Sequence, residues 1–93
     1  MTTQVAGIEV ELFGVPRVLA RQRALRVTGS TLGEVAAALG VACPALIGAV
    51  IDGELRWLRE GYTFVVDERF TRDPAYRLAA SSSVLLVSSV AGG

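Results

Sequence analysis

Residues 30–40, STLGEVAAALG, restrict the possible folds of this 93-residue chain more than any other stretch. Thr31 followed three residues later by Glu34 fits a capping box, and Gly40 fits the left-handed position that ends a helix. Apolar residues between these signals recur with helical spacing, at Leu32, Val35, Ala36 and Leu39. The chain around this segment is dominated by strand patterns, so the sequence predicts one main helix lying on a sheet.

Two strands precede the helix. Residues 7–13, GIEVELF, alternate apolar and polar side chains with the period of two that is typical of a half-buried strand. Gly14 and Pro16 indicate a turn or loop after this strand. Residues 24–29, ALRVTG, then repeat the alternation of apolar and polar side chains. The two segments are expected to pair as an antiparallel hairpin.

Further strands follow the helix. Residues 61–70, GYTFVVDERF, predict a strand, a turn at Asp67–Glu68 and a short strand around residues 69–71. Residues 43–53 favour a further short helical segment ending at Asp52–Gly53, and residues 72–78 a turn or one 3₁₀ turn.

The last strand is apolar at every position from 84 to 87, which indicates a place in the centre of the sheet, beside the first strand. We therefore expect an α+β fold with the order β-β-α-β-β-β. A mixed sheet is covered by one main helix, in a single domain over residues 1–93 with an extended, flexible C-terminal tail at 88–93.

Composition excludes several function classes. Nine arginines balance nine acidic residues, so the chain has no basic footprint for nucleic acid or an anionic membrane. It has no histidine or lysine, and Cys43 is its one cysteine, which argues against histidine acid–base catalysis and cysteine-rich metal sites. We expect no metal and no bound cofactor. The N-terminal residues lack a signal-peptide pattern and no apolar stretch reaches membrane-spanning length, so a cytoplasmic location is expected.

The side chains offer few candidates for chemistry. The five serines near the C-terminus have no histidine or lysine to activate them and are interpreted as turn and strand-edge hydroxyls. Cys43, between Ala42 and Pro44, is interpreted as a packed and inert thiol. Trp57 and Leu58 stand between two arginines, and core or edge packing is favoured over a partner-binding patch.

The closing diglycine, Gly92–Gly93, is the remaining candidate site. Glycine lacks Cβ, so this backbone could pass through a narrow channel and bring its carbonyl carbon against a nucleotide phosphate. A partner enzyme could then join the carboxylate to AMP, making a mixed anhydride that sulfur or amine nucleophiles attack.

The hairpin, the helix opened by TLGEVAAAL, the YTFVVDERF strand pair, the apolar last strand and the final AGG together resemble the ubiquitin-like β-grasp sulfur carriers of the MoaD and ThiS family. The resemblance covers almost the whole chain, with two departures. LAASSSVLL stands where many members have a Gly-Asp turn, and SSVAGG lacks the proline pair that molybdopterin-type carriers often have before the diglycine.

The resemblance implies that the protein is a carrier and not an enzyme. An ATP-using, E1-like adenylating enzyme of the ThiF/MoeB type would activate Gly93, and a sulfur donor would convert it to a thiocarboxylate. Gly92 would be the spacer, Val90 and Ala91 would contact the partner along the tail, and the apolar sheet face would dock on the activating enzyme. A downstream synthase would accept the sulfur for molybdopterin, thiamin, cysteine, tRNA or a secondary metabolite.

Two other functions use the same fold. A protein modifier would join Gly93 to lysines of other proteins, although the lack of lysine forbids chains linked through its own side chains. A non-catalytic β-grasp binding module would make no use of the diglycine.

Overall fold

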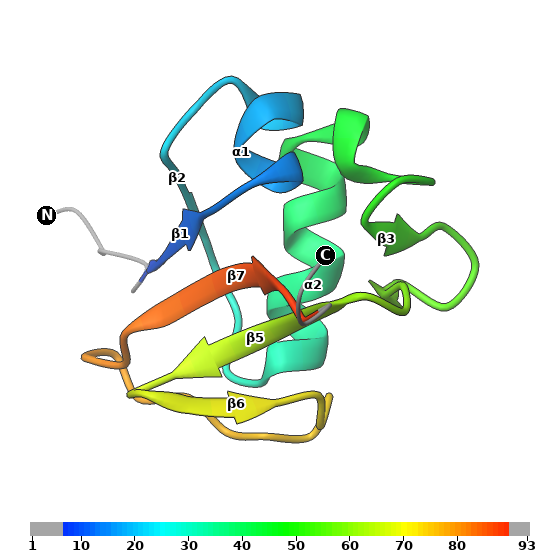
Figure 1. The fold of residues 1–93 in the computed structure, drawn as a ribbon. Helices are drawn as coiled ribbons and strands as arrows, with labels where there is room; N and C mark the ends of the chain where they lie inside the picture. Colours follow the sequence, from blue (N-terminus) through cyan, green and yellow to red (C-terminus); the bar gives the residue numbers. More distant parts are fainter. Residues whose placement is uncertain (1–6, 90–93) are drawn as a thin grey trace, which may run out of the picture.

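Seven strands and two α-helices follow one another in the computed structural model, which describes residues 7–89 (Figure 1). The first half contains β1 (Ile8–Leu12), α1 (Val15–Ala20), β2 (Ala24–Val27), α2 (Leu32–Ala42) and the 3₁₀ turn η1 (Pro44–Leu46). The second half contains β3 (Ile51–Asp52), β4 (Trp57–Leu58), β5 (Tyr62–Val66), β6 (Arg69–Thr71) and β7 (Val84–Ser88).

Five of the strands form one mixed sheet in the order β2-β1-β7-β5-β6. β7 is its central strand, running parallel to β1 and antiparallel to β5. The predicted β1–β2 hairpin is present, with Ile8 opposite Val27 and Val10 opposite Leu25. The expected α+β architecture, a mixed sheet with the last strand central beside the first, is confirmed.

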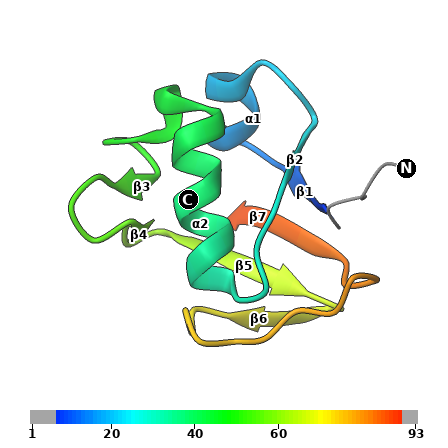
Figure 2. The same cartoon turned by 180° about the vertical axis from the view of Figure 1, so that it is seen from behind.

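The helix α2 lies across one face of this sheet, as Figure 2 shows from behind. Alternate residues of each strand point toward it, because successive side chains of a strand face opposite sides of the sheet. The fully buried side chains of this core include Val10, Leu12, Leu32, Val35, Leu39, Leu46, Phe64, Val66, Val84 and Leu86. One helix is therefore sufficient to cover the inner face of the sheet.

The start of α2 is capped as the sequence predicts. The Thr31 side chain accepts a hydrogen bond from the backbone N–H of Glu34 at 3.2 Å. The Glu34 carboxylate reaches back to Ser30, accepting from its backbone N–H at 2.7 Å and from its hydroxyl at 3.0 Å. The Thr31 hydroxyl thus satisfies a donor of the first turn, and the Glu34 carboxylate fixes the residue before the N-cap.

The end of α2 differs from the expectation that Gly40 ends it. The helix continues to Ala42, and the Cys43 N–H donates to the Leu39 carbonyl at 2.8 Å before Pro44 stops it. Gly40 is buried inside the helix, where an added Cβ would lie 3.4 Å from Ile47 Cγ1. Gly40 therefore lies within the helix against Ile47 and does not serve as its cap, which is Cys43.

Short elements occur where the sequence predicted other structure. The connection between β1 and β2 contains α1, with Pro16 in its first turn, where proline is well tolerated. Residues 43–53 were expected to be helical up to Asp52–Gly53, but they form only η1 before Ile51 and Asp52 pair with β4. A two-residue strand is too short to show an alternating pattern.

The predicted turn between β5 and β6 is confirmed. Asp67 and Glu68 have φ values of 49° and 74°, which suit the tight two-residue turns of β-hairpins. The expected turn at residues 72–78 is also present, since the Asp73 carboxylate accepts from the Ala75 N–H at 2.9 Å and the Asp73 carbonyl from the Tyr76 N–H at 3.0 Å.

The Glu34 carboxylate gives the fold a pH-dependent contribution. Hydrogen bonds from the Ser30 backbone and then from its hydroxyl lower the pKa of Glu34 below its ordinary value of 4.5. Such a group stabilises the folded state above its unfolded pKa and loses that effect as the pH falls through its folded pKa. We predict that Glu34→Gln lowers the thermal midpoint at neutral pH, and that the difference from the unsubstituted protein shrinks as the pH falls below 4.5.

Glu60→Gln is the matched control, because the exposed Glu60 side chain makes no hydrogen bond or ion pair with any residue between 7 and 89. Thermal melts monitored by circular dichroism over this pH range measure both variants. An equal loss in the two variants at neutral pH would contradict the role assigned to the cap.

Candidate functional site

The carboxyl end of β7 is the place where the chain leaves the sheet toward the predicted tail. Ser88 pairs with Tyr62 of β5, and the Ser89 N–H donates to the Gly61 carbonyl at 2.7 Å. Ser88 and Ser89, expected to begin the tail, are therefore still paired with β5 and its preceding residue. The predicted site residues Val90, Ala91, Gly92 and Gly93 lie outside the described residues. We call the edge formed by Phe13, Gly61 and Ser89 the exit edge.

Arg72 organises the β5 side of the exit edge. Its guanidinium donates to the carbonyls of Arg59 at 3.3 Å and Leu58 at 3.2 Å, and also to the Tyr62 carbonyl. One side chain from the end of β6 thus fixes the backbone from β4 into β5. Because Gly61 lies within this segment, Arg72 indirectly holds the carbonyl that accepts from Ser89.

Phe13 and Arg17 organise the β1 side of the exit edge. The Phe13 N–H donates to the Leu86 carbonyl at 3.1 Å, which extends the β1–β7 pairing by one residue. Arg17, on α1, donates to the Leu12 carbonyl at 3.1 Å, and its guanidinium carbon lies 5.4 Å from the centre of the Phe13 ring. The unpredicted helix α1 therefore has a role, since it positions the end of β1.

The sheet face away from α2 carries an apolar half, on β5, β6 and β7. Val65 stands opposite Phe70 on one side and Leu85 on the other, and Val87 stands opposite Thr63. Phe70 is 72% exposed, a large fraction for an aromatic side chain. We call Val65, Phe70, Leu85 and Val87 the open apolar face. It adjoins the exit edge, because Val87 is followed directly by Ser88 and Ser89.

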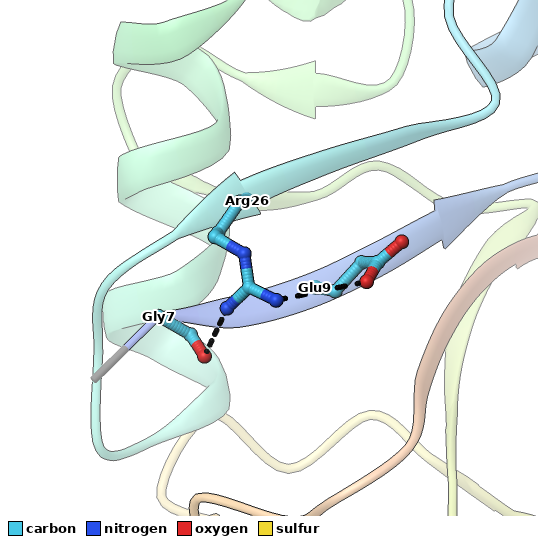
Figure 3. Close-up of polar contacts among 3 residues, drawn as sticks. All are labelled: Gly7, Glu9 and Arg26. Carbon is cyan, nitrogen blue, oxygen red and sulfur yellow. Dashed lines mark hydrogen bonds and ion pairs between the residues drawn. The ribbon is translucent and has the colours of Figure 1, made fainter.

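The remainder of this sheet face, on β1 and β2, is polar. Figure 3 shows Arg26 donating to the Gly7 carbonyl at 2.9 Å while its other terminal nitrogen lies 3.7 Å from the Glu9 carboxylate. Both side chains of this ion pair are more than half exposed, so it contributes little to stability. The open side of the sheet is thus divided into a charged half and an apolar half.

The segment that leads into β7, where the sequence resemblance would place a Gly-Asp turn, is closed by serines. The Ala79 N–H donates to the Ser82 hydroxyl at 2.9 Å, and the Ser82 N–H donates to the Ala79 carbonyl at 3.0 Å. Ser83 then exchanges two hydrogen bonds with Asp67, each at 3.0 Å. These hydroxyl and backbone contacts support the interpretation of the serines as turn residues, and they set the start of β7.

The other sequence candidates are packed into the fold. Leu58 is buried, and the Trp57 ring lies 5.8 Å from the Phe64 ring, centre to centre, so core packing is confirmed for this pair. The Cys43 side chain is half-buried against the core. Within residues 7–89 no three acidic, cysteine or histidine side chains are grouped so that they could hold a metal ion. Nor is any helix of that range long and apolar enough to cross a membrane.

At the level of sequence, no protein-family model matches this chain and no curated protein is similar to it. Solved structures do match. Small archaeal modifier protein 1 (SAMP1) from Haloferax volcanii is 26% identical with a TM-score of 0.78, over 94% of this chain and 99% of that protein. A chain of the BexX/CysO complex from Amycolatopsis orientalis is 14% identical with a TM-score of 0.74, over 92% of this chain and 99% of that one. Urm1 from Trypanosoma brucei is 19% identical with a TM-score of 0.62, over 99% and 100% of the two chains.

The fold and these matches define a ubiquitin-like β-grasp protein. This fold, shared with the small archaeal modifier protein, with the chain of the BexX/CysO complex and with Urm1, agrees with the sequence resemblance to the β-grasp proteins of the MoaD and ThiS family.

We predict that Arg72→Gln loosens the exit edge. The substitution removes a cationic donor that serves three carbonyls, so the free energy of unfolding should fall by about 1 kcal/mol. The Ser89 amide should exchange with solvent faster, because its acceptor Gly61 is less firmly held. Chemical denaturation and hydrogen exchange measured by NMR test both effects.

Arg69→Gln is the control, because Arg69 lies on β6 three residues before Arg72 and no hydrogen bond or ion pair joins its side chain to the described part of the chain. Unchanged protection of the Ser89 amide in Arg72→Gln would contradict the proposed positioning.

Proposed function

We propose that the protein is a sulfur carrier whose C-terminal carboxylate, on Gly93, is activated by an ATP-using, E1-like enzyme. The carboxylate attacks the α-phosphorus of ATP and displaces pyrophosphate, giving an acyl adenylate. Sulfide from a donor then attacks the acyl carbon and displaces AMP, leaving a thiocarboxylate. The observation that supports this most directly is the β-grasp fold, whose central strand leads toward the diglycine at the end of the sequence.

The chain acts in this proposal as a co-substrate. It supplies the acyl carbon, and the partner enzyme supplies the catalytic groups and binds the ATP, so the carrier itself needs no cofactor. Gly92 serves as the spacer, because two residues without Cβ allow the terminal carbonyl to approach a nucleotide through a narrow passage. Val90 and Ala91 contact the walls of that passage. A cytoplasmic location belongs to the same proposal.

The open apolar face is the docking surface that the proposal assigns to the activating enzyme, which we take to be of the ThiF/MoeB type. Val87 lies in this face two residues before Ser89, so an enzyme that binds the face also lies close to the point where the tail begins. A synthase that accepts the sulfur would use the same surface after the first enzyme has left. Phe70 is the most exposed residue of this face, so it is the side chain expected to contribute most to binding the enzyme.

A second function, attachment of Gly93 to lysines of other proteins, is favoured by the names of two neighbours. Both SAMP1 proteins, from Haloferax volcanii and Methanosarcina acetivorans, are called modifiers. The same adenylate would serve, with an amine in place of sulfide. Since the chain has no lysine, conjugates through its own side chains are not formed, and single attachment is the expected product.

We predict that incubation with the cognate adenylating enzyme, ATP and sulfide replaces one oxygen of the protein by sulfur. Intact-mass spectrometry detects this change. Deleting Gly92 and Gly93 should abolish it while the thermal midpoint stays nearly the same, because chain termini contribute few packed contacts.

An unchanged mass in the complete mixture would argue against the carrier function. Gly93 found bonded to lysines of other proteins in cell extracts, without any thiocarboxylate, would favour the modifier function. A large fall in thermal midpoint on deletion would mean that the diglycine is structural.

We also predict that Phe70→Asp weakens binding to the adenylating enzyme by about tenfold or more, because a charge replaces a central apolar anchor. The fold should be unaffected, since this side chain is 72% exposed. Calorimetric titration measures the affinity, with Glu9→Gln in the polar half of the same face as control. Equal weakening by both substitutions would exclude a specific role for the open apolar face.

A further inference from the structure

The short helix α1 lies next to the exit edge. β1 and β7 run parallel, so both strands end at the same side of the sheet, where α1 follows β1 and the predicted tail follows β7 (Figure 1). The helix also packs against β7. A partner protein that takes the end of the chain therefore has α1 beside it.

The charges carried by α1 and by the turn after it are of one sign. Residues 12–33 contain four arginines and no acidic residue, although the whole chain has no net charge. Arg26 is neutralised by its ion pair with Glu9. The other three have no ion-pair partner within residues 7–89, and we call them the α1 arginines: Arg17, Arg21 and Arg23.

Backbone contacts gather the α1 arginines around the end of β1. The Arg23 carbonyl accepts from the Leu12 N–H at 2.8 Å, and the Arg17 side chain donates to the Leu12 carbonyl at 3.1 Å. The Arg21 N–H donates to the Arg17 carbonyl at 2.8 Å. Leu12 directly precedes Phe13 of the exit edge, so all three arginines start from positions close to that edge.

Arg17 is held in place with part of its guanidinium available. Its Nε donates to the Leu12 carbonyl, and the guanidinium carbon lies 5.4 Å from the centre of the Phe13 ring. The two terminal nitrogens make no hydrogen bond or ion pair with any residue in the described range 7–89. A carboxylate can accept two parallel hydrogen bonds from such a group, and less side-chain freedom is lost because the group is already oriented.

Arg21 occupies a backbone position that favours glycine. It follows the last residue of α1 with φ 58°, in the left-handed region. Glycine is the usual residue where a helix ends in this conformation, because it has no Cβ to clash with the backbone. Arginine here is less favourable for the fold than glycine, but it adds a positive charge beside the exit edge.

Few negative charges lie near the α1 arginines. Glu11, on β1, is the nearest acidic residue along the chain, and no ion pair joins it to any of the three. Two elements that pack against α1, η1 and β7, contain no charged residue. Three positive charges and one negative charge leave this end of the molecule positive, which favours an acidic partner.

Exposed valines accompany the α1 arginines. Val15 is 48% and Val18 73% exposed, and residues three apart are neighbours on a helix surface. Contacts to nucleic-acid phosphates are made by charged and polar groups, so apolar side chains at this place favour a protein partner. An aliphatic side chain of that partner would cover the two valines.

We propose that the α1 arginines, Val15 and Val18 form a docking surface for an acidic segment of the partner protein that takes the end of the chain. Carboxylates of the segment pair with the arginines, and its aliphatic side chains pack on the valines. The identity of the partner rests on the proposed carrier function, whereas the presence of the surface does not. A partner that also binds the open apolar face holds the chain on both sides of the exit edge.

The probes are two peptides, acetyl-Asp-Leu-Asp-Leu-Asp-amide and acetyl-Lys-Leu-Lys-Leu-Lys-amide, titrated into the full chain labelled with ¹⁵N. The acidic peptide should cause saturable shifts at the amides of Val18, Arg21 and Arg23. It should bind about tenfold or more tightly than the basic peptide, because its charges are complementary to the arginines. Added salt should weaken its binding, since the charge pairs are exposed to solvent.

Replacing the three α1 arginines together by glutamine should remove the preference for the acidic peptide. The matched control replaces three exposed arginines elsewhere by glutamine, with the same change of net charge: Arg56, Arg59 and Arg69. Val18→Gln should weaken binding, whereas Val41→Gln should not, because Val41 is a valine of similar exposure, 82%, on α2. Well-dispersed amide spectra establish that each variant folds.

Arg21→Gly separates binding from stability. The substitution should weaken binding of the acidic peptide by about threefold, as expected for one exposed charge pair. The thermal midpoint should not fall, because glycine adopts the left-handed conformation easily. Unchanged peptide affinity together with a lower thermal midpoint would mean that Arg21 serves the fold and would contradict its place in the docking surface.

Equal affinity for the two peptides, absence of saturable shifts around α1, or equal loss in the two triple variants would overturn the docking surface. Tighter binding of a short oligothymidylate to the same residues would also overturn it, because phosphate would then be the ligand. Each of these results holds whatever the intact-mass experiment on Gly93 shows. Conversely, specific binding of the acidic peptide with no thiocarboxylate formed would uphold the surface and argue against the carrier function.

Discussion

The pairing of β7 with two neighbours at once is the interaction on which the rest of the structure depends. Three of its residues pair with β1 on one side and all five pair with β5 on the other, and within the described residues no other strand links β1 and β2 to the β5–β6 hairpin in this sheet. Val84 and Leu86 from the same strand are buried beneath α2. The segment that closes the fold is thus the segment that continues into the candidate site.

The two faces of the sheet therefore have different roles. One sheet face is filled by the helix and the core. The other face presents Phe70 and its apolar neighbours next to the edge where the chain leaves the sheet, and charged residues farther away. The proposed carrier function needs little more from so small a domain, because an enzyme that holds the sheet face and the tail can supply the catalytic groups.

The sequence was most informative where side chains report directly on their environment. Alternation in GIEVELF and ALRVTG predicted β1 and β2, and the unbroken apolar run at 84–87 predicted a central strand, because a strand buried on both faces has no polar positions. The Thr31 cap likewise predicted the start of α2 correctly. The expectation that Gly40 ends α2 was wrong, since a glycine that ends a helix and one that lies inside it look alike in sequence.

Other elements of the fold could not be predicted, because no local sequence pattern indicates them. The helix α1 has only six residues and follows Gly14. Glycine is typical of loops, so the sequence did not indicate a helix here. β3 and β4 have two residues each, which is too few to show an alternating pattern. Arg72 was not a candidate from the sequence, because its three carbonyl acceptors come together only when β4, β5 and β6 are in place. The role of the diglycine as the site of activation was predicted from the chemistry of an unhindered terminal carboxylate, and that role stays a prediction.

The direction of β7 also has a mechanical consequence. A pull on the chain beyond Ser89 acts along the strand axis, so it loads the hydrogen bonds to β1 and β5 in shear, all together. A tail leaving from an edge strand at a right angle would instead be peeled away one bond at a time. In the proposed carrier function, an enzyme that pulls the end of the chain along this axis loads both rows of hydrogen bonds together, so the domain can remain folded while its end is held.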